Sequence, residues 1–506
     1  MTKPSPNMFS ARSAARLFSG VAGALVIFLG MMSAAPAFAV LGEWSTPVNL
    51  SASGQGSGDP QIAVDGSGNA VAIWRRYDGN SNIAQSSWSD DGGASWSASV
   101  DLSEPGEGVS NPRIALGGSG VAHAVWNRYD GSNTRVQYTR SVDGGVTWSV
   151  PVNLSTAGVN GQNPEIAPDG SGNLVAVWRG SNGDYDIIQS SRSTNSGLSW
   201  STPVDMSLTG QDSRSPQVAF DGSGIAVAVW LRSDSSNQIV QASRSTNGGA
   251  SWSAPADLSE SGVDSERPEV ALDGSGNAIA VWGRDPFGDT IIQSSRLLVG
   301  GASWSTPVDV STAGNTAATP QLAVDGSGNA VAVWRYLAVG GTIIQSSHSA
   351  DGGVSWSTPV QLSASGLSSD NPQVAANASG NTVAVWQQSN GTNLIIRFSQ
   401  STDGGANWTV VTDLSEPGQS AITPDVAVDG TGNSIAIWRR SNGENDIIQA
   451  SFSLEISGGG GGGEGLANTG PGGTVNDATL VASLGLLALG VLSRVFVRRR
   501  GVANLR

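Results

Sequence analysis

The chain of 506 residues is 38% hydrophobic and 13% charged, and it contains 68 glycines and no cysteine. A composition this rich in glycine and poor in charge fits many short strands joined by tight turns, and the lack of cysteine excludes disulfides, thiol nucleophiles and cysteine-ligated metals. The net charge of −15 argues against nucleic acid or an anionic membrane surface as a partner.

Residues 1–39 have the features of a secretory signal peptide. Three basic residues precede an apolar run over residues 17–32, and small residues around Ala39 provide a cleavage site. We therefore expect cleavage after Ala39 and export of the rest of the chain. An uncleaved membrane anchor is the alternative.

Residues 40–456 are organised by tryptophans that recur every 52 residues. One series consists of Trp44, Trp96, Trp148, Trp200, Trp252, Trp304, Trp356 and Trp408. A second series keeps the same interval and consists of Trp74, Trp126, Trp178, Trp230, Trp282, Trp334, Trp386 and Trp438. A period of this length over eight copies indicates supersecondary units that bury their apolar faces against neighbouring copies.

Each repeat predicts a four-stranded antiparallel meander. In the repeat that starts at Trp148, runs at 164–169 and 173–179 flank a glycine-containing hairpin turn, residues 187–191 form a third strand, and the next begins at Trp200. Central strands such as residues 329–334 are apolar on both faces, so both faces must be covered. We therefore predict an all-β chain folded as an eight-bladed β-propeller, with a β-solenoid as the alternative.

The two ends of the repeat region predict how the ring closes. The chain opens with a lone strand after Trp44 and ends after residues 447–453 without a matching one. We expect the first strand to complete the last sheet, because that pairing hides the two edges of an open ring.

A turn segment with Ser, Asp, Gly and a hydroxyl residue precedes the first-series tryptophans. It is complete as Ser89, Asp91, Gly93, Ser95 and Trp96, as Ser141, Asp143, Gly145, Thr147 and Trp148, and as Ser349, Asp351, Gly353, Ser355 and Trp356. The pattern resembles the Asp-box, or BNR, repeat of sialidases and related propellers, over residues 44 to about 455. Other copies depart from it at Asn195, Asn247, Asn407, Leu297 and Val299. Asp and Ser side chains can bond turn amides, so we expect these boxes to be structural.

An arginine follows the second-series tryptophan by one or two positions in seven repeats, in loops that vary between copies. These candidate ligand-binding residues are Arg75, Arg128, Arg179, Arg232, Arg284, Arg335 and Arg439. One interpretation is that each pairs with a carboxylate of an adjacent loop and straps blade to blade. The other is a ring of guanidinium groups that binds carboxylate or sulfate groups of a glycan or peptide. Calcium at the glycine-rich hairpins is a weaker hypothesis than a plain turn, and we expect no metal or cofactor.

The resemblance to sialidases raises the alternative of an exo-sialidase. That family clamps a carboxylate with three arginines and uses a Tyr nucleophile primed by Glu, with an Asp acid/base. Here Tyr77, Tyr129 and Tyr336 are copies of one another without a neighbouring Glu, and the family's Arg-Ile-Pro is absent, with Arg113-Ile114-Ala115 the nearest match. We therefore predict no catalytic residues.

The C-terminal region predicts surface attachment. Residues 457–470 form a glycine-rich linker that ends in Leu466-Ala467-Asn468-Thr469-Gly470, and residues 471–506 comprise a spacer, an apolar span of membrane length and a basic tail. This order resembles the cell-wall sorting signal of bacterial sortases, which implies cleavage between Thr469 and Gly470 and linkage to the wall. A Pro is common where Ala467 stands, so the resemblance is to a separate sortase class; a retained membrane anchor is the alternative.

These observations predict a monomeric, non-catalytic binding module displayed on a bacterial cell surface. The expected ligand is a glycan or another extracellular molecule, bound at several similar sites. A sialidase-like hydrolase and a passive structural spacer are the alternatives.

Overall fold

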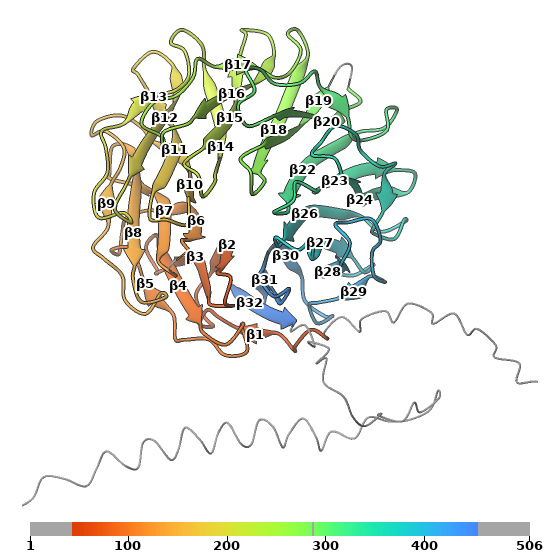
Figure 1. Cartoon of the computed structure of the whole chain (residues 1–506). Coiled ribbons are helices and arrows are strands. Elements are labelled where there is room, and N and C mark those ends of the chain that lie inside the picture. The colour runs from red at the N-terminus through yellow and green to blue at the C-terminus, as the bar shows by residue number, and fades with distance from the viewer. Residues whose placement is uncertain (1–42, 119, 286–287, 454–506) are drawn as a thin grey trace, which may run out of the picture. The chain divides into compact units, whose positions relative to one another are not determined.

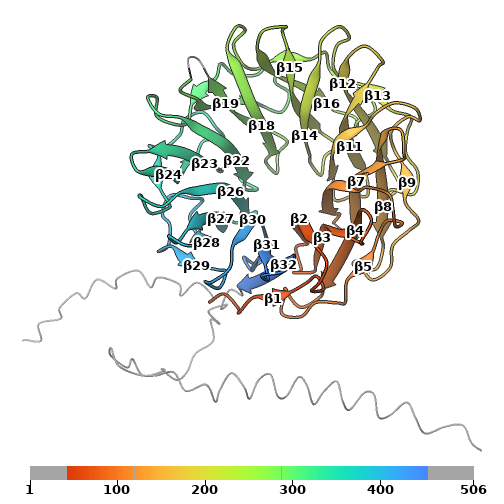
Figure 2. The ribbon, with the colours of Figure 1, turned by 180° about the vertical axis from the view of Figure 1, so that it is seen from behind.

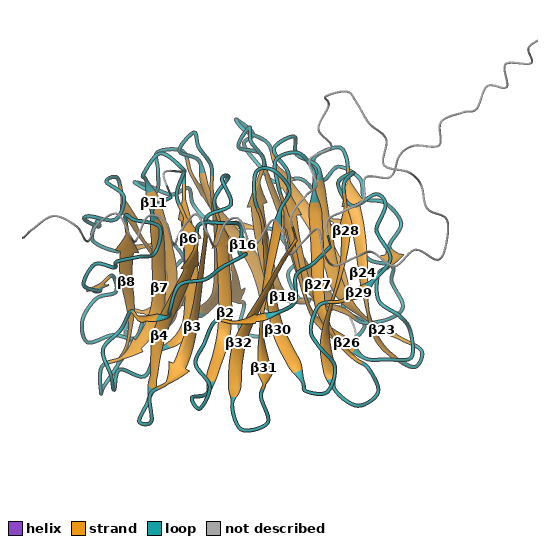
Figure 3. Cartoon of the chain, turned by 90° about the horizontal axis from the view of Figure 1, so that it is seen from below, coloured by secondary structure: helices purple, strands orange, loops and turns teal. Residues whose placement is uncertain are grey.

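The computed structural model describes residues 43–453 apart from residues 119, 286 and 287, and these form eight four-stranded antiparallel sheets. The sheets are arranged in a ring, with one strand of each sheet nearest the axis (Figure 1, and Figure 2 from behind). Seen from the side, the strands run between two ends of the ring that carry the turns and loops (Figure 3). The predicted eight-bladed β-propeller is confirmed.

Seven blades are contiguous in the chain, and their strands run outward from the axis in sequence order. Blades 1 to 3 consist of β2 (Ser57–Val64), β3 (Ala70–Tyr77), β4 (Asn82–Ser89), β5 (Val100–Asp101), β6 (Ser110–Leu116), β7 (Ala122–Tyr129), β8 (Thr134–Ser141), β9 (Val152–Asn153), β10 (Gln162–Pro168), β11 (Leu174–Ser181), β12 (Asp186–Ser193) and β13 (Val204–Asp205). Blades 4 and 5 consist of β14 (Ser213–Phe220), β15 (Ala226–Ser233), β16 (Gln238–Ser245), β17 (Ala256–Asp257), β18 (Asp264–Leu272), β19 (Ala278–Asp285), β20 (Ile291–Leu297) and β21 (Val308–Asp309). Blades 6 and 7 consist of β22 (Ala317–Val324), β23 (Ala330–Ala338), β24 (Gly341–Ser349), β25 (Val360–Gln361), β26 (Ser369–Ala376), β27 (Thr382–Ser389), β28 (Leu394–Ser401) and β29 (Thr412–Asp413).

Blade 8 is closed by the N-terminal strand, as expected. It contains β30 (Ala421–Val428), β31 (Ser434–Ser441) and β32 (Asp446–Ser453), and β1 (Val48–Asn49) forms its outer strand. In this pairing Val48 lies opposite Ala450 and Asn49 opposite Gln449. The first strand therefore covers an edge that would otherwise be open.

The interior explains why the second strands are apolar on both faces. All eight second-series tryptophans are fully buried. Trp74 packs against Ile435 and Ile437 of the preceding blade, whereas its neighbour Ile73 packs with Trp126 of the following blade. Because successive side chains of a strand point to opposite faces, each central strand contributes to two inter-blade cores.

A bulge recurs in the first strand of every blade and was not foreseen. The residue before a proline has a positive φ, between 49° and 55°, at Asp59, Asn111, Asn163, Ser215, Arg267, Thr319, Asn371 and Thr423. The strand register shifts there in each blade, for example between Gly58 and Gln61. The bulge re-aims the following side chains toward the axis.

The expected signal peptide (1–39), linker with sorting motif (457–470) and C-terminal span (471–506) lie outside the described residues, so cleavage at Ala39 and at Thr469–Gly470 stays a prediction. Within residues 43–453, no helix has the length and apolarity needed to cross a membrane.

Candidate functional site

The two ends of the propeller differ in their turns, and we name them the box face and the loop face. The box face carries the first hairpin and the box turn of each blade, which touch where Gly248 N donates to Gly224 O at 3.0 Å. The loop face carries the loops after the second strand and the inter-blade loops, joined where Tyr77 N donates to Gly56 O at 2.7 Å. This assignment follows from the antiparallel order of the four strands, whose successive connections lie at alternate ends of the blade.

The box side chains are used within their own turn. Ser141 Oγ donates to Asp143 Oδ1 at 2.7 Å and accepts the Gly145 amide at 2.8 Å. Thr147 donates its amide to Oδ1 and its hydroxyl to Oδ2 of Asp143, at 2.9 and 2.6 Å. The Thr147 hydroxyl is the main reason that the pKa of Asp143 falls to about 2. The turn is thus self-contained, and Trp148 completes it by donating to Gly145 O at 3.1 Å.

The seven predicted arginines fall into two sets that point in opposite directions. Arg75, Arg179, Arg335 and Arg439 directly follow a second-series tryptophan, whereas Arg128, Arg232 and Arg284 stand one position further on. Since side chains alternate along a strand, the first set faces the following blade and the second set the preceding blade. The structure therefore does not bring the seven together into one ring.

Each of the seven has a carboxylate partner on the loop face. The pairs are Arg75–Asp59 at 2.6 Å, Arg128–Glu107 at 2.6 Å, Arg179–Asp186 at 3.3 Å, Arg232–Asp257 at 3.3 Å, Arg284–Glu260 at 2.7 Å, Arg335–Asp370 at 3.5 Å and Arg439–Asp446 at 3.6 Å. The Arg128 contact is close in distance, although its Nε is not aligned for a hydrogen bond. Of these pairs, Arg335–Asp370 joins two blades. This geometry fits loop bracing, and ligand binding by these residues stays a prediction.

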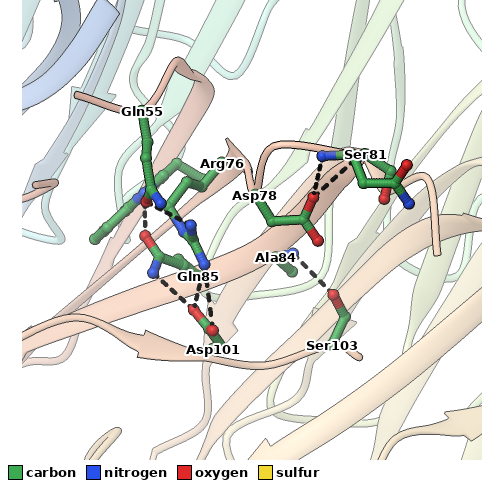
Figure 4. Close-up of polar contacts among 10 residues, drawn as sticks. Gln55, Arg76, Asp78, Ser81, Ala84, Gln85, Asp101 and Ser103 are labelled. Atoms are coloured by element: carbon green, nitrogen blue, oxygen red, sulfur yellow. Dashed lines mark hydrogen bonds and ion pairs between the residues drawn. The ribbon is translucent and has the colours of Figure 1, made fainter. Parts of the chain in front are cut away.

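Figure 4 shows how such bracing works in the first blade. Arg76 contacts Gln55 of the inter-blade loop and lies 3.3 Å from Asp101 of the outer strand. Gln85 donates to the same carboxylate at 2.7 Å. The predicted Arg232 repeats this arrangement with Gln211 and Asp257. A guanidinium group held between an amide oxygen and a carboxylate in this way has little capacity left for a ligand.

The axis is lined by a ring of polar side chains two positions after each bulge. They are Gln61, Arg113, Glu165, Gln217, Glu269, Gln321, Gln373 and Asp425. A cavity of about 340 Å³ lies against part of the ring. Arg113 Nε donates to Glu165 at 2.7 Å, and Gln217 and Gln321 each donate to Glu269 at 3.4 Å.

Burial dominates the electrostatics of this axial ring. It raises the pKa of Glu269 to about 8, with help from the nearby Glu165, and it raises the pKa of Asp425 to about 6. Glu269 lines the axial cavity, and the Glu269 and Asp425 residues are each only partly buried. Residues 43–453, without 119, 286 and 287, contain no group of three or more His, Asp or Glu that could hold a metal.

The tyrosines considered for catalysis are engaged in loop contacts. Tyr77 and Tyr129 donate to the backbone carbonyls of Gly79 and Gly131, and Tyr336 accepts a bond from Asn315. These bonds hold the ends of the second strands in place. They do not bring a Glu to the phenol, which a Tyr nucleophile of the sialidase kind would need.

Sequence reasoning missed a second arginine series on the box face. Arg140, Arg192, Arg244 and Arg296 stand at the end of the third strand in blades 2 to 5. None of the four has a carboxylate partner within the described part of the chain. Arg140 donates to Ser196 O at 2.8 Å in the box turn of the next blade. We call these four the box-face arginines.

The boxes next to three of these arginines have lost their carboxylate. Arg140, Arg192 and Arg244 face the boxes of blades 3, 4 and 5, where Asn195, Asn247 and Val299 replace the Asp. Boxes that keep Asp91, Asp143 and Asp403 follow blades with Phe452, Trp88 and His348 at the arginine position. The first hairpins of the blades also place carboxylates on the box face. One of them, Asp169, accepts hydrogen bonds from the backbone amides of Ser171 and Asn173 in its own turn. The box-face arginines recur every 52 residues, and this interval is the sequence signal that could have revealed them.

No protein-family model matches the chain, and no curated protein matches it. Solved structures similar to it include a protein of unknown function from Dyadobacter fermentans, with 13% identity, a TM-score of 0.43, and coverage of 81% of this chain and 98% of that one. An ulvan lyase has 11% identity and a TM-score of 0.47, covering 74% and 96%. A leech intramolecular trans-sialidase has 14% identity and a TM-score of 0.40, covering 76% and 82%.

Proposed function

We propose that this protein is an exported, non-catalytic propeller that binds an anionic extracellular glycan through its box-face arginines. The observation that carries the proposal is the coincidence of Arg140, Arg192 and Arg244 with neighbouring boxes that lack the Asp. The arginines add positive charge to the box face, and the boxes without Asp remove negative charge from it. The chain as a whole carries a net charge of −15. An acidic polymer is repelled by most of such a surface and attracted to the strip of box-face arginines.

The chemistry of the strip suits carboxylate or sulfate groups. A guanidinium group presents a planar fork of donors that matches either anion. The arginines occur once per blade on successive blades, so a repetitive polymer can engage several of them at once. Weak contacts then combine, because after the first contact the others form at high effective concentration.

Display on the cell surface is part of the proposal. The leader up to Ala39 supports export, and the motif at Thr469–Gly470 supports wall linkage by a sortase-type transpeptidase. Mass spectrometry of the mature protein tests this. A C-terminus at Thr469 is expected. An intact tail ending at Arg506 would contradict wall linkage and would support a retained membrane anchor.

Binding is tested with immobilised hyaluronan and heparin, with neutral dextran as the control. Every blade is complete within the described residues, so residues 40–456 can be tested as the propeller without the two terminal segments. The triple variant Arg140→Gln, Arg192→Gln, Arg244→Gln should weaken polyanion binding at least about tenfold, which corresponds to about 1.4 kcal/mol. The matched control Arg75→Gln, Arg179→Gln, Arg439→Gln removes the same charge from the loop face and should change binding less than about twofold.

The outcomes separate the alternatives. Loss of binding in the loop-face variant alone would place the site at the originally predicted arginines. Failure to bind any polyanion would support a passive structural role, and release of methylumbelliferone from a sialoside by the unaltered protein would support a hydrolase.

A further inference from the structure

A cavity of about 480 Å³ lies between blades 4 and 5, along the outer strand of blade 4 and beside the box turn of blade 5. Its lining includes Arg244, Asp257, Leu258, Leu297 and Trp304. The volume is within the range of about 300–1,000 Å³ that small-molecule sites occupy. Arg244 places the cavity on the strip of box-face arginines.

In the box turn of blade 5, Leu297 packs with Ile225 and Val227 of blade 4, but the second glycine does not reach that blade. In a complete box the second glycine is pressed onto the preceding blade: a Cβ on Gly353 would lie 3.3 Å from Ile279 of blade 5. The corresponding Gly301 has only its own turn nearby, because a Cβ there would meet Leu298 O at 2.9 Å. The fifth turn is closed by a bond from Gly301 N to Leu298 O, also 2.9 Å, in place of the lost Ser and Asp contacts.

Trp304 makes neither of the hydrogen bonds that its counterparts make. Trp252 and Trp356 donate to Ser190 Oγ and Ser294 Oγ of the preceding blade, at 3.0 and 2.8 Å. The residue that corresponds to these serines for Trp304 is Ala242. Trp96 and Trp148 instead donate to a glycine carbonyl of their own complete box, at 3.1 Å. In blade 5 the corresponding carbonyl belongs to Gly301, and Trp304 makes no hydrogen bond to it among the described residues.

The indole N–H of Trp304 is therefore unpaired within the described part of the chain, and its nitrogen is not fully buried. Trp44, Trp200 and Trp408 also lack acceptors there, but their indole nitrogens are sealed from water. Trp304 differs because its nitrogen is not buried and its side chain lines the cavity. A donor in this situation is available to an acceptor brought by a ligand.

Among the charged side chains of the lining, Arg244 has no carboxylate partner within the described part of the chain. Asp257 lies 3.3 Å from Arg232 and accepts a bond from Gln241 at 2.7 Å, so its charge is already balanced. Arg244 has only a long contact, 3.5 Å, to Leu298 O. The cavity thus combines an uncompensated guanidinium group, an unpaired indole N–H and the apolar surface of Leu258, Leu297 and Trp304.

We propose that this cavity binds a single acidic sugar residue, with its carboxylate toward Arg244 and its ring against Trp304. A sugar ring has an apolar face that packs on an indole and hydroxyl oxygens that accept from its N–H. The inference rests on the proposed function, since it makes this cavity the point on the arginine strip where one residue of an acidic glycan is held.

The test uses methyl β-glucuronide and its neutral counterpart methyl β-glucoside, with binding to the propeller measured by saturation-transfer NMR and calorimetry. The glucuronide should bind at least about fivefold more tightly. Arg244→Gln should abolish that preference. Ala242→Ser restores the acceptor that Trp252 and Trp356 have, and it should weaken glucuronide binding severalfold without impairing the fold.

Ser190→Ala is the matched control, because it removes the acceptor of Trp252 in blade 4, whose box turn packs normally; glucuronide binding should be unchanged. Unaltered glucuronide binding in both Ala242→Ser and Arg244→Gln, or equal affinity for the two sugars, would overturn the inference. Such a result could coexist with hyaluronan binding that depends on Arg140 and Arg192, so the proposed function would stand. Glucuronide binding without polymer binding would uphold the cavity and remove the proposed polymer ligand.

Discussion

Ser51 Oγ accepts a hydrogen bond from the backbone amide of Ile448 at 2.8 Å, although the two residues are 397 positions apart. In the same joint, Leu50 N donates to Ile448 O at 2.8 Å, and the Leu50 side chain is buried with Trp74 and Ile448. The beginning of the repeat region is thus built into the last blade.

Replacing Leu50 by Ala should lower the free energy of unfolding by about 3 kcal/mol, because the buried side chain leaves a cavity in the joint. Urea unfolding followed by tryptophan fluorescence measures this. Val48→Ala is the control, since Val48 lies in the same strand but is 38% exposed. Deleting residues 43–51 should destabilise the propeller further by opening the edge of β32. A truncated propeller as stable as the intact one would contradict the closure.

The axial ring makes stability depend on pH. The raised pKa of Glu269, about 8 against 4.5 in the unfolded chain, means that the folded state keeps a proton that the unfolded state has lost. This contribution is complete below pH 4.5 and is lost as the pH rises through 8. Glu269→Gln should therefore gain stability relative to the native protein across that window, by on the order of 1–3 kcal/mol at pH 8.

Urea midpoints at pH 5 and pH 8 test this expectation. The exposed Glu444→Gln serves as the control and should follow the native protein at both values. A Glu269→Gln variant whose advantage is the same at pH 5 and pH 8 would show that the axial carboxyl group does not carry the dependence.

The box of blade 2 separates the role of charge from the role of hydrogen bonding. Asp143→Asn should be nearly neutral at pH 7, because Asn195 makes the equivalent bonds to Ser199 at 3.0 and 2.8 Å in the next box. Asp143→Ala removes the acceptor and should cost about 1–2 kcal/mol. The lowered pKa of Asp143, about 2 against 3.8, predicts that the native advantage over Ala is present above pH 3.8 and declines as the pH falls through 2. Thermal unfolding of the three proteins at pH 7 and pH 2.5 measures both effects.

The inter-blade pair of Arg335 and Asp370 should contribute little. Both side chains are about one-third exposed, and such pairs contribute about 0.5 kcal/mol or less. Arg335→Gln should shift the urea midpoint only slightly, and Asp370→Asn should match it. A loss above about 2 kcal/mol in either variant would mean that this pair straps the blades together.

Several features followed from local pattern alone. The interval between Trp96 and Trp148, together with the continuous apolar run around Trp334, was enough to predict stacked four-stranded blades, because a repeat that cannot bury its own faces must bury them on its neighbours. The unpaired strand after Trp44 likewise predicted the closure. Both predictions follow from the apolar faces and the strand edges that each segment must cover.

The functional surface was decided by tertiary structure. Arg75 and Arg128 look equivalent in the sequence, but alternation along the strand sends them to opposite blades, and the loops that meet there supply Asp59 and Glu107 as partners. The blade 4–5 cavity depends on Ala242 and Leu297, which lie in different repeats and act on the same indole only after the blades stack. The repeat period specifies which blades are neighbours. Whether an arginine has a carboxylate partner depends on side-chain contacts between segments far apart in the chain.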